Sequence, residues 1–369
     1  MAANAFEIAV MPGDGIGNEV MDAALHVLDA VEKRYGIGTR RDMIPGGAHH
    51  YRDTGIAMSE DGFARADKAH AILFGAMGWP EIRYPDGTEI APQLDLRFRF
   101  ELFAGVRPIR AIPGVPVALA DPRAKGIDLV ILRESTEGLF ASRGKGEVID
   151  DREARDTQVI TRATTEQLTA FSFELARRRA KQKGRTGKVT LIDKANVFRS
   201  FAFMRKVFDE VAARYPDVTA AHHYVDATAL DLIRRPWDFD VMPTENMFGD
   251  ILSDLGAGLI GGMGFAPSAD IGRANAMFQP SHGSAPDIFG KRIANPTAMI
   301  LSAAMMLDWL GARHASPAAE TAAAAMTKAV DLAFGNGQVR SYDIGGKDGT
   351  DTIAKVVADA ILSGAADPA

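Results

Sequence analysis

Two aspartates four residues apart, Asp250 and Asp254, form the most informative chemical pattern in the sequence. On a helix this spacing puts both carboxylates on one face, where they repel each other unless a cation binds between them. A site built only from oxygen ligands suits Mg²⁺ or Mn²⁺ rather than zinc. A solvated acidic face is the alternative interpretation, but the apolar neighbours Ile251 and Leu252 favour a half-buried metal site. Asp226, after a strand-like segment, offers a third carboxylate.

Three arginines, Arg97, Arg107 and Arg133, are set against apolar runs. A buried guanidinium without an anionic partner is strongly unfavourable, so each of these side chains needs an anion nearby. A substrate that carries carboxylates would supply it. Internal salt bridges are the better explanation for any one of these arginines, but not for all three.

Lys194 follows an apolar strand-like run and precedes a helical one, so we expect it at a strand-to-helix junction. Burial or a neighbouring metal would lower the pKa of Lys194, so that it could act as a general base there. The alternative is an ordinary surface lysine.

Groups that could bind a polar ligand gather in a glycine-containing loop, His282–Asp287, and in Asn295, which follows it. Asp287 matters most, because a carboxylate accepts hydrogen bonds from ribose hydroxyls and repels a 2′-phosphate, which favours NAD over NADP. An earlier loop, Gly13–Gly17, has G-x-G-x-G spacing instead of the dinucleotide-binding fingerprint. A tight glycine turn that enters a helix is an equally good interpretation of that loop.

Alternating strands and helices must position these residues. Apolar runs predict strands at Phe6–Met11, Ala71–Phe74, Val117–Leu119, Leu129–Arg133, Val189–Asp193, Val241–Pro243 and Met277–Gln279. Helical spacing predicts helices at Glu19–Tyr35, Thr164–Lys181 and Phe201–Arg214, a buried or subunit-contacting helix at Pro296–Leu310, and an alanine-rich surface helix at Ala315–Ala325. This alternation predicts an α/β protein with a largely parallel sheet.

Composition narrows the function classes. A length of 369 residues favours two domains, and the absence of cysteine excludes thiolate metal sites and a cysteine nucleophile. A formal net charge of -6 without a long basic run argues against a nucleic-acid partner. No apolar stretch is long enough to span a membrane and the first residues do not read as a secretory signal, so we expect a cytoplasmic location and no membrane partner.

Taken together, these segments resemble the β-decarboxylating dehydrogenase family, which includes 3-isopropylmalate, isocitrate, homoisocitrate and tartrate/D-malate dehydrogenases. The matching segments, in family order, are Pro12–Gly17, Leu94–Pro108, Arg133–Gly138, Asp193–Asn196, Tyr224–Ala227, Asn246–Asp254 and His282–Pro296. The resemblance implies a two-domain α/β fold of isopropylmalate/isocitrate dehydrogenase type, not a Rossmann fold. Residues 1–102 plus 261–369 would form a nucleotide-binding domain. Residues 103–260 would form an inserted domain with the dimer interface and the metal and substrate residues.

The resemblance also implies a homodimer with shared active sites and a small-molecule substrate. Mg²⁺ or Mn²⁺ would bind Asp250 and Asp254 of one subunit, while catalytic Lys194 and the further ligand Asp226 would reach in from the partner. The substrate would contact Arg97, Arg107, Arg133, Gln93 and Leu94. NAD would bind His282, Gly283, Ser284, Ala285, Asp287 and Asn295. The implied reaction is oxidation, with decarboxylation, of a 3-substituted malate, and 3-isopropylmalate is our first choice.

Two positions depart from the family pattern. Phe140 replaces the tyrosine associated with the final protonation, so water or another group takes that step, or the substrate is oxidised without obligatory decarboxylation. Where isopropylmalate enzymes present a pair of leucines, this chain has Ile90, Gln93 and Leu94. Either Gln93 binds a polar substituent, which keeps tartrate/D-malate and homoisocitrate/isocitrate substrates open, or it points to solvent and Leu94 alone defines an apolar pocket for isopropylmalate. A non-catalytic metal-binding relative and a plain Rossmann hydroxy-acid dehydrogenase are the remaining alternatives.

Overall fold

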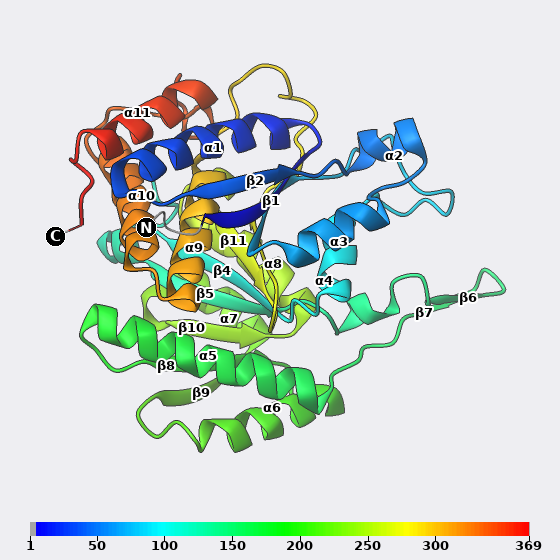
Figure 1. The fold of residues 1–369 in the computed structure, drawn as a ribbon. Helices are drawn as coiled ribbons and strands as arrows, with labels where there is room; N and C mark the ends of the chain where they lie inside the picture. Colours follow the sequence, from blue (N-terminus) through cyan, green and yellow to red (C-terminus); the bar gives the residue numbers. More distant parts are fainter. Residues whose placement is uncertain (1–4, 369) are drawn as a thin grey trace.

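A ten-stranded sheet runs through the whole molecule in the computed structural model, which describes residues 5–368 (Figure 1). In spatial order its strands are β2 (Thr39–Met43), β1 (Phe6–Gly13), β3 (Ala71–Ala76), β12 (Ala276–Pro280), β11 (Pro267–Ile271), β4 (Ala104–Arg110), β5 (Asp128–Glu134), β10 (Val241–Thr244), β8 (Lys188–Asp193) and β9 (Thr219–Tyr224). The flanks β2-β1-β3-β12 and β5-β10-β8-β9 are parallel. The centre, from β12 through β11 and β4 to β5, is antiparallel. The predicted α/β sheet is therefore confirmed as largely parallel, with a centre that reverses direction.

Both ends of the chain build one flank of the sheet and the middle of the chain builds the other. Strands β1–β3, β11 and β12 come from the terminal segments, whereas β4, β5 and β8–β10 come from residues 104–244. On the first flank lie the long helices α1 (Ile16–Tyr35), α9 (Thr297–His314), α10 (Pro317–Gly335) and α11 (Thr350–Leu362) (Figure 1). The shorter helices α2 (Ala48–Thr54), α3 (Glu60–Lys68) and α4 (Pro92–Arg99) join the early strands. This arrangement supports the discontinuous domain division, whose boundaries stay a prediction.

Helices cover both faces of the second flank because the side chains of a strand alternate between its two faces. In β5, Val130 and Leu132 join the hydrophobic cluster of α5 (Arg162–Lys183) and α6 (Arg199–Ala212). Leu129 and Ile131 point the other way and join the cluster of α7 (Val225–Arg234) and α8 (Asn246–Leu259). The pair β6 (Glu147–Ile149) and β7 (Glu153–Arg155) forms a separate hairpin that projects from the body (Figure 1).

Two sequence predictions about secondary structure and burial were wrong. Val117–Leu119 is not a strand. It follows Pro116, and the backbone hydrogen bond from Ala118 N to Leu259 O joins it to the end of a helix and not to another strand. The alanine-rich segment is helical as predicted, within α10, but it is not a surface helix: residues such as Ala322 and Ala325 are fully buried. Small side chains let α10 pack closely against α9.

The remaining predicted helices and strands are present, and α9 is buried within the chain. No helix among residues 5–368 is long and apolar enough to cross a membrane.

Candidate active site

A polar cleft of about 360 Å³ contains most of the residues singled out from the sequence. Its lining includes Gln93, Leu94, Arg97, Arg107, Arg133, Asp250, Asp254, His282 and Gly283. Strand alternation explains why the arginines meet the aspartates. Arg107 lies on the same face of β4 as Ile109, and Arg133 on the same face of β5 as Ile131, and both isoleucines pack in the cluster of α8. The aspartates lie on α8 itself, which confirms the predicted helix.

A buried aspartate, Asp270 on β11, holds two of the arginines in place. Its Oδ2 lies 3.2 Å from Nη2 of Arg97 and its Oδ1 lies 3.1 Å from Nη2 of Arg107. Burial by itself would raise the pKa of Asp270, but Arg107, Arg97 and Arg133 lower it to about 2. Gln279 also donates to Asp270 Oδ2 over 2.7 Å. Asp270 was not predicted from the sequence, because no sequence pattern indicated the short strand β11 that carries it.

Three guanidinium groups surround this one buried carboxylate, so the region around Asp270 is positively charged, and the carboxylates of Asp250 and Asp254 balance that charge across the cleft. Burial lowers the pKa of Arg133 to about 10, so the group remains charged at neutral pH. Nε of Arg97 is buried and has no hydrogen-bond partner among the described residues. An unpaired buried donor needs an acceptor, so the cleft is suited to an anionic ligand. The expectation that internal salt bridges would not account for all three arginines was wrong, because Arg97 and Arg107 pair with Asp270 and Arg133 pairs with Asp250. A substrate carboxylate as a further partner stays a prediction.

The aspartate pair stands at the edge of this positive region. Asp250 pairs with Arg133, and α8 can approach β5 closely because Gly249 faces Arg133, where an added Cβ would lie 2.6 Å from Arg133 Cβ. Glu245 caps the helix by accepting from Met247 N over 3.1 Å. Burial and the charge of Asp250 raise the pKa of Asp254. This repulsion between two oxygen donors is what a divalent cation would relieve, so the pair fits Mg²⁺ or Mn²⁺.

Lys194 and Asp226 do not reach the cleft within one chain. They pair with each other, with Lys194 Nζ 2.7 Å from Asp226 Oδ1, and neither lines the cavity. Lys194 follows the last residue of β8, as predicted, and Asp226 lies in the first turn of α7. Within residues 5–368 no group of three acidic or histidine side chains could hold a metal. One chain thus offers only part of the expected ligand set.

The predicted nucleotide loop lies between β12 and α9, next to the cleft. Ser284 Oγ donates to Gly78 O over 2.6 Å, and Ile16 N donates to Ser284 O over 2.9 Å. Gly15 has φ +54°, and an added Cβ would lie 2.1 Å from Ser284 O. The segment Gly13–Gly17 is therefore a tight turn that enters α1 and supports the loop through backbone contacts.

Side chains of this loop remain available to a ligand. Nε2 of His282 is buried without a hydrogen-bond partner in the described chain, and burial lowers the pKa of His282. Asp287 is exposed. Asn295 is instead occupied locally: its Oδ1 accepts from Thr297 N over 3.0 Å and its Nδ2 donates to Asp343. The loop thus offers an imidazole that lines the cleft and a carboxylate exposed to solvent.

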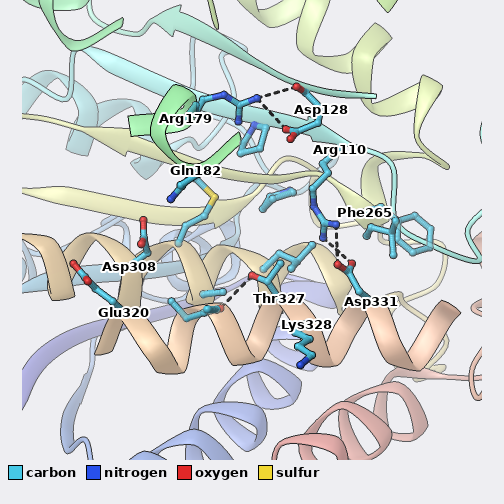
Figure 2. Close-up of a pocket in the computed structure, with 18 residues that line it drawn as sticks. Arg110, Asp128, Arg179, Gln182, Phe265, Asp308, Glu320, Thr327, Lys328 and Asp331 are labelled. Carbon is cyan, nitrogen blue, oxygen red and sulfur yellow. Dashed lines mark hydrogen bonds and ion pairs between the residues drawn. The ribbon is translucent and has the colours of Figure 1, made fainter. Parts of the chain in front are cut away.

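Another cavity, of about 480 Å³, lies on the other face of the sheet, as the lining residues Pro108 and Arg110 alternate with Arg107 (Figure 2). Its charged side chains largely satisfy one another: Arg110 pairs with Asp331 at 2.8 Å and Arg179 with Asp128 at 2.9 Å. None of the sequence-predicted site residues lines it. The polar cleft is therefore the better candidate for the active site.

Residues 7–361 match the family model described as isocitrate/isopropylmalate dehydrogenase. The chain belongs to this family. The 3-isopropylmalate dehydrogenase of Methanothermobacter thermautotrophicus is 41% identical over 355 residues, which cover 95% of this chain and 97% of that protein. This match extends the family relationship over nearly the whole chain.

Solved structures of family members agree. The crystal structure of isocitrate dehydrogenase from Methylococcus capsulatus has a TM-score of 0.83 at 33% identity, covering 97% of this chain and 99% of that one. An apo β-decarboxylating dehydrogenase from Thermococcus kodakarensis has a TM-score of 0.78 at 35% identity, covering 97% and 96%. The chain is a β-decarboxylating dehydrogenase with the isocitrate/isopropylmalate dehydrogenase fold, and the Rossmann alternative is wrong.

Proposed function

We propose that the protein oxidises and decarboxylates a 3-substituted malate, with NAD as the hydride acceptor and Mg²⁺ or Mn²⁺ as the metal. The observation that carries this proposal is the convergence of Arg97, Arg107 and Arg133 with Asp250 and Asp254 on one cleft. A malate derivative has two carboxylates for the arginines and a hydroxyl beside one of them for the metal. Family relatives named 3-isopropylmalate dehydrogenase make 3-isopropylmalate the first substrate to test.

The protein's own residues divide the work. The arginines bind and orient the substrate carboxylates, and Asp250 and Asp254 hold the metal. When bound, the metal supplies Lewis acidity toward the substrate hydroxyl and NAD supplies a hydride acceptor. Lys194, as the neutral amine, takes the hydroxyl proton and becomes an ammonium, and Asp226, whose Oδ1 lies 2.7 Å from Lys194 Nζ, positions that side chain. Loss of carbon dioxide from the resulting β-keto acid follows in the same cleft.

We further propose a homodimer whose active sites are shared. Leu230 and Ile233 on α7 and Ile251 on α8 are 55%, 46% and 62% exposed, which gives these neighbouring helices an uncovered apolar face. A second copy on this face would bury it and would bring the partner's Lys194 and Asp226 toward the incomplete ligand set. On this view residues 103–260 carry the interface, and residues 1–102 plus 261–369 bind NAD.

The proposed NAD preference rests on the exposed Asp287 in the loop His282–Asp287. Its carboxylate would accept hydrogen bonds from the ribose hydroxyls of NAD and repel the 2′-phosphate of NADP. The proposed cofactor site also includes Gly283, Ser284, Ala285 and Asn295.

Phe140 leaves the last proton transfer without the usual phenol. Its ring lies in the cleft, 4.9 Å from the guanidinium carbon of Arg133, and has no proton to give. Water or another group therefore protonates the enolate that loss of carbon dioxide leaves, or oxidation proceeds without obligatory decarboxylation. The ratio of carbon dioxide to NADH during turnover decides between them, because a one-to-one yield removes the second option.

The function is tested with a panel of D-malate, tartrate, 3-isopropylmalate, isocitrate and homoisocitrate, each with NAD or NADP and with Mg²⁺, Mn²⁺ or EDTA. We expect NADH formation that needs the metal and falls with EDTA. Activity that is indifferent to EDTA would contradict the metal site. No turnover of any substrate would favour a non-catalytic metal-binding protein.

A further inference from the structure

Arg133 is the one cleft arginine that does not pair with Asp270. Two residues of α8 hold it instead. Its Nε donates to Asn246 Oδ1 over 2.8 Å, and its Nη1 pairs with Asp250. Asn246 and Asp250 are four residues apart, so they lie on the same face of that helix. One helix therefore contacts the guanidinium group at two of its three nitrogens.

These two contacts of Arg133 are not equivalent. The Asp250 side chain is 50% exposed, lines the cleft and is one of the two proposed metal ligands, so its oxygens have another use. Asn246 is 1% exposed, does not line the cleft and has a neutral side chain. Asn246 is therefore the contact of Arg133 for which neither the metal nor the substrate would compete.

The amide of Asn246 is itself fixed at both ends. Its Nδ2 donates to Glu137 O over 3.0 Å, while its Oδ1 accepts from Arg133. Only one orientation of the amide satisfies both contacts, because the NH₂ group can only donate and the carbonyl oxygen can only accept. The carboxylate of Glu137 accepts in turn from the backbone N of Thr161, the N-cap residue of α5, over 2.8 Å. Asn246 thus ties Arg133 to the connection between β5 and α5.

This arrangement leaves Nη2 of Arg133 available to a ligand. Nη2 donates to no acceptor among residues 5–368, whereas Nε and Nη1 are both occupied. The ring of Phe140 lies 4.9 Å from the guanidinium carbon and further restricts the group. With Nε held by Asn246, Nη2 keeps a fixed position at the wall of the cleft.

We propose that Asn246 is a positioning residue for substrate binding, which holds Nε of Arg133 so that Nη2 meets a substrate carboxylate in a fixed geometry. This inference rests on the proposed function and adds a residue to it. A long arginine side chain without such a contact would have to be ordered when the substrate binds, which costs binding free energy. Holding the side chain beforehand avoids that cost and orients the carboxylate for the reaction.

The first test uses Asn246→Leu, which removes both hydrogen bonds and nearly preserves the side-chain volume. In steady-state kinetics with Mn²⁺, we expect KM to rise at least about tenfold for whichever of 3-isopropylmalate and isocitrate the wild type uses better. KM for NAD should stay within about twofold, because Arg133 contacts only the proposed substrate. A purely structural role would lower kcat through loss of folded enzyme and leave both KM values unchanged.

An unchanged substrate KM in Asn246→Leu overturns this inference alone. No turnover of any substrate by the wild type overturns the proposed function, and this inference with it. Mn²⁺ affinity, followed by electron paramagnetic resonance without substrate, shows whether α8 itself has been disturbed. It should stay within about threefold, because Asn246 is not a proposed ligand, and a tenfold loss would overturn the assignment to Arg133.

Asn275→Leu is the matched control. Asn275 is also a buried asparagine, and its Nδ2 donates to a backbone oxygen, that of Asp67, over 3.2 Å. It lies between β11 and β12 and does not line the cleft. Its replacement should leave the substrate KM within about twofold. An equal rise of KM in Asn275→Leu and Asn246→Leu would show a general effect of losing a buried amide and would overturn the proposal.

A double-mutant cycle tests whether Asn246 acts through Arg133. Arg133→Lys keeps the positive charge but lacks the planar set of donors that Asn246 holds. In the Arg133→Lys background, Asn246→Leu should lower kcat/KM by no more than about twofold, against at least about tenfold in the wild-type background. Equal factors in the two backgrounds would mean that the residues act independently, which overturns the positioning role.

Discussion

Nη2 of Arg107 lies 3.1 Å from Oδ1 of Asp270, and both side chains are buried beneath the substrate cleft. This contact connects β4, from the middle of the chain, with β11, from its terminal part. The same carboxylate pairs with Arg97 on α4. One side chain thus fixes the positions of two groups that we propose bind the substrate.

Asp270→Asn should therefore lower both stability and activity. Removing one partner of a buried ion pair leaves the other charge uncompensated, which typically costs about 3–5 kcal/mol. Urea unfolding followed by circular dichroism measures this cost. Asp359→Asn, which breaks the exposed pair of Asp359 with Lys355 on α11, serves as the control and should change little. Equal unfolding midpoints for Asp270→Asn and the wild type would show that the buried cluster is not stabilising.

The pH dependence of stability follows from the same carboxylate. The pKa of Asp270 is lowered in the folded protein to about 2 from 3.8, so its contribution is fully present above about pH 4 and is lost as the pH falls toward 2. Unfolding measured between pH 2 and pH 6 should show this loss in the wild type. The loss should be smaller in Asp270→Asn, and parallel curves for the two proteins would contradict the assignment.

Asp254→Asn should weaken metal binding. Changing a group that merely supports a ligand costs 10–100-fold in affinity, so removing a ligand should cost at least about 100-fold. Mn²⁺ binding followed by electron paramagnetic resonance measures affinity without turnover. The Asp359→Asn variant again serves as the control. Wild-type Mn²⁺ affinity in Asp254→Asn would place the metal elsewhere.

Lys194→Ala and Asp250→Asn should complement each other if the active site is shared. Each variant alone should be almost inactive, because each lacks one half of every site. Co-expressed at equal levels, half of the dimers would be mixed and each would contain one intact site, which gives about one quarter of wild-type activity. Purification through two different affinity tags isolates the mixed dimers, whose activity should be about one half of wild type. Mixed dimers without activity would show that the site forms within one chain.

Asp287→Lys should change the nucleotide preference. Replacing the carboxylate with an ammonium group removes a ribose acceptor and attracts a 2′-phosphate, so the ratio of kcat/KM for NADP to that for NAD should rise at least about tenfold. Lys291→Ala, near the end of the same loop region, is the control. An unchanged ratio of kcat/KM for NADP to that for NAD in Asp287→Lys would mean that another residue binds the ribose hydroxyls.

The placement of a residue could be predicted where the residues next to it in the sequence determine that placement. Asp250 and Asp254 share a helix face, and Arg133 and Lys194 stand at the ends of apolar strands, so local patterns indicated their placement. Asp270 was missed, because its importance comes from Arg97 and Arg107, which lie far away in the chain. The edge strands β2 and β9 were missed because polar residues such as Arg40 and His222 interrupt any apolar run. The buried alanines of α10 could not be told from surface alanines without knowing which helices pack on them.

The pairing of β3 with β12 has a consequence for biosynthesis. Ile72 and Met277 are partners in this ladder, so β12 can pair with β3 only after most of the polypeptide has left the ribosome. The strands between residues 104 and 244 need no such delay, because they pair largely with each other. We therefore expect the central part of the nascent chain to become protease-resistant before the amino-terminal part, because the edge of β3 stays unpaired until β12 has been synthesised.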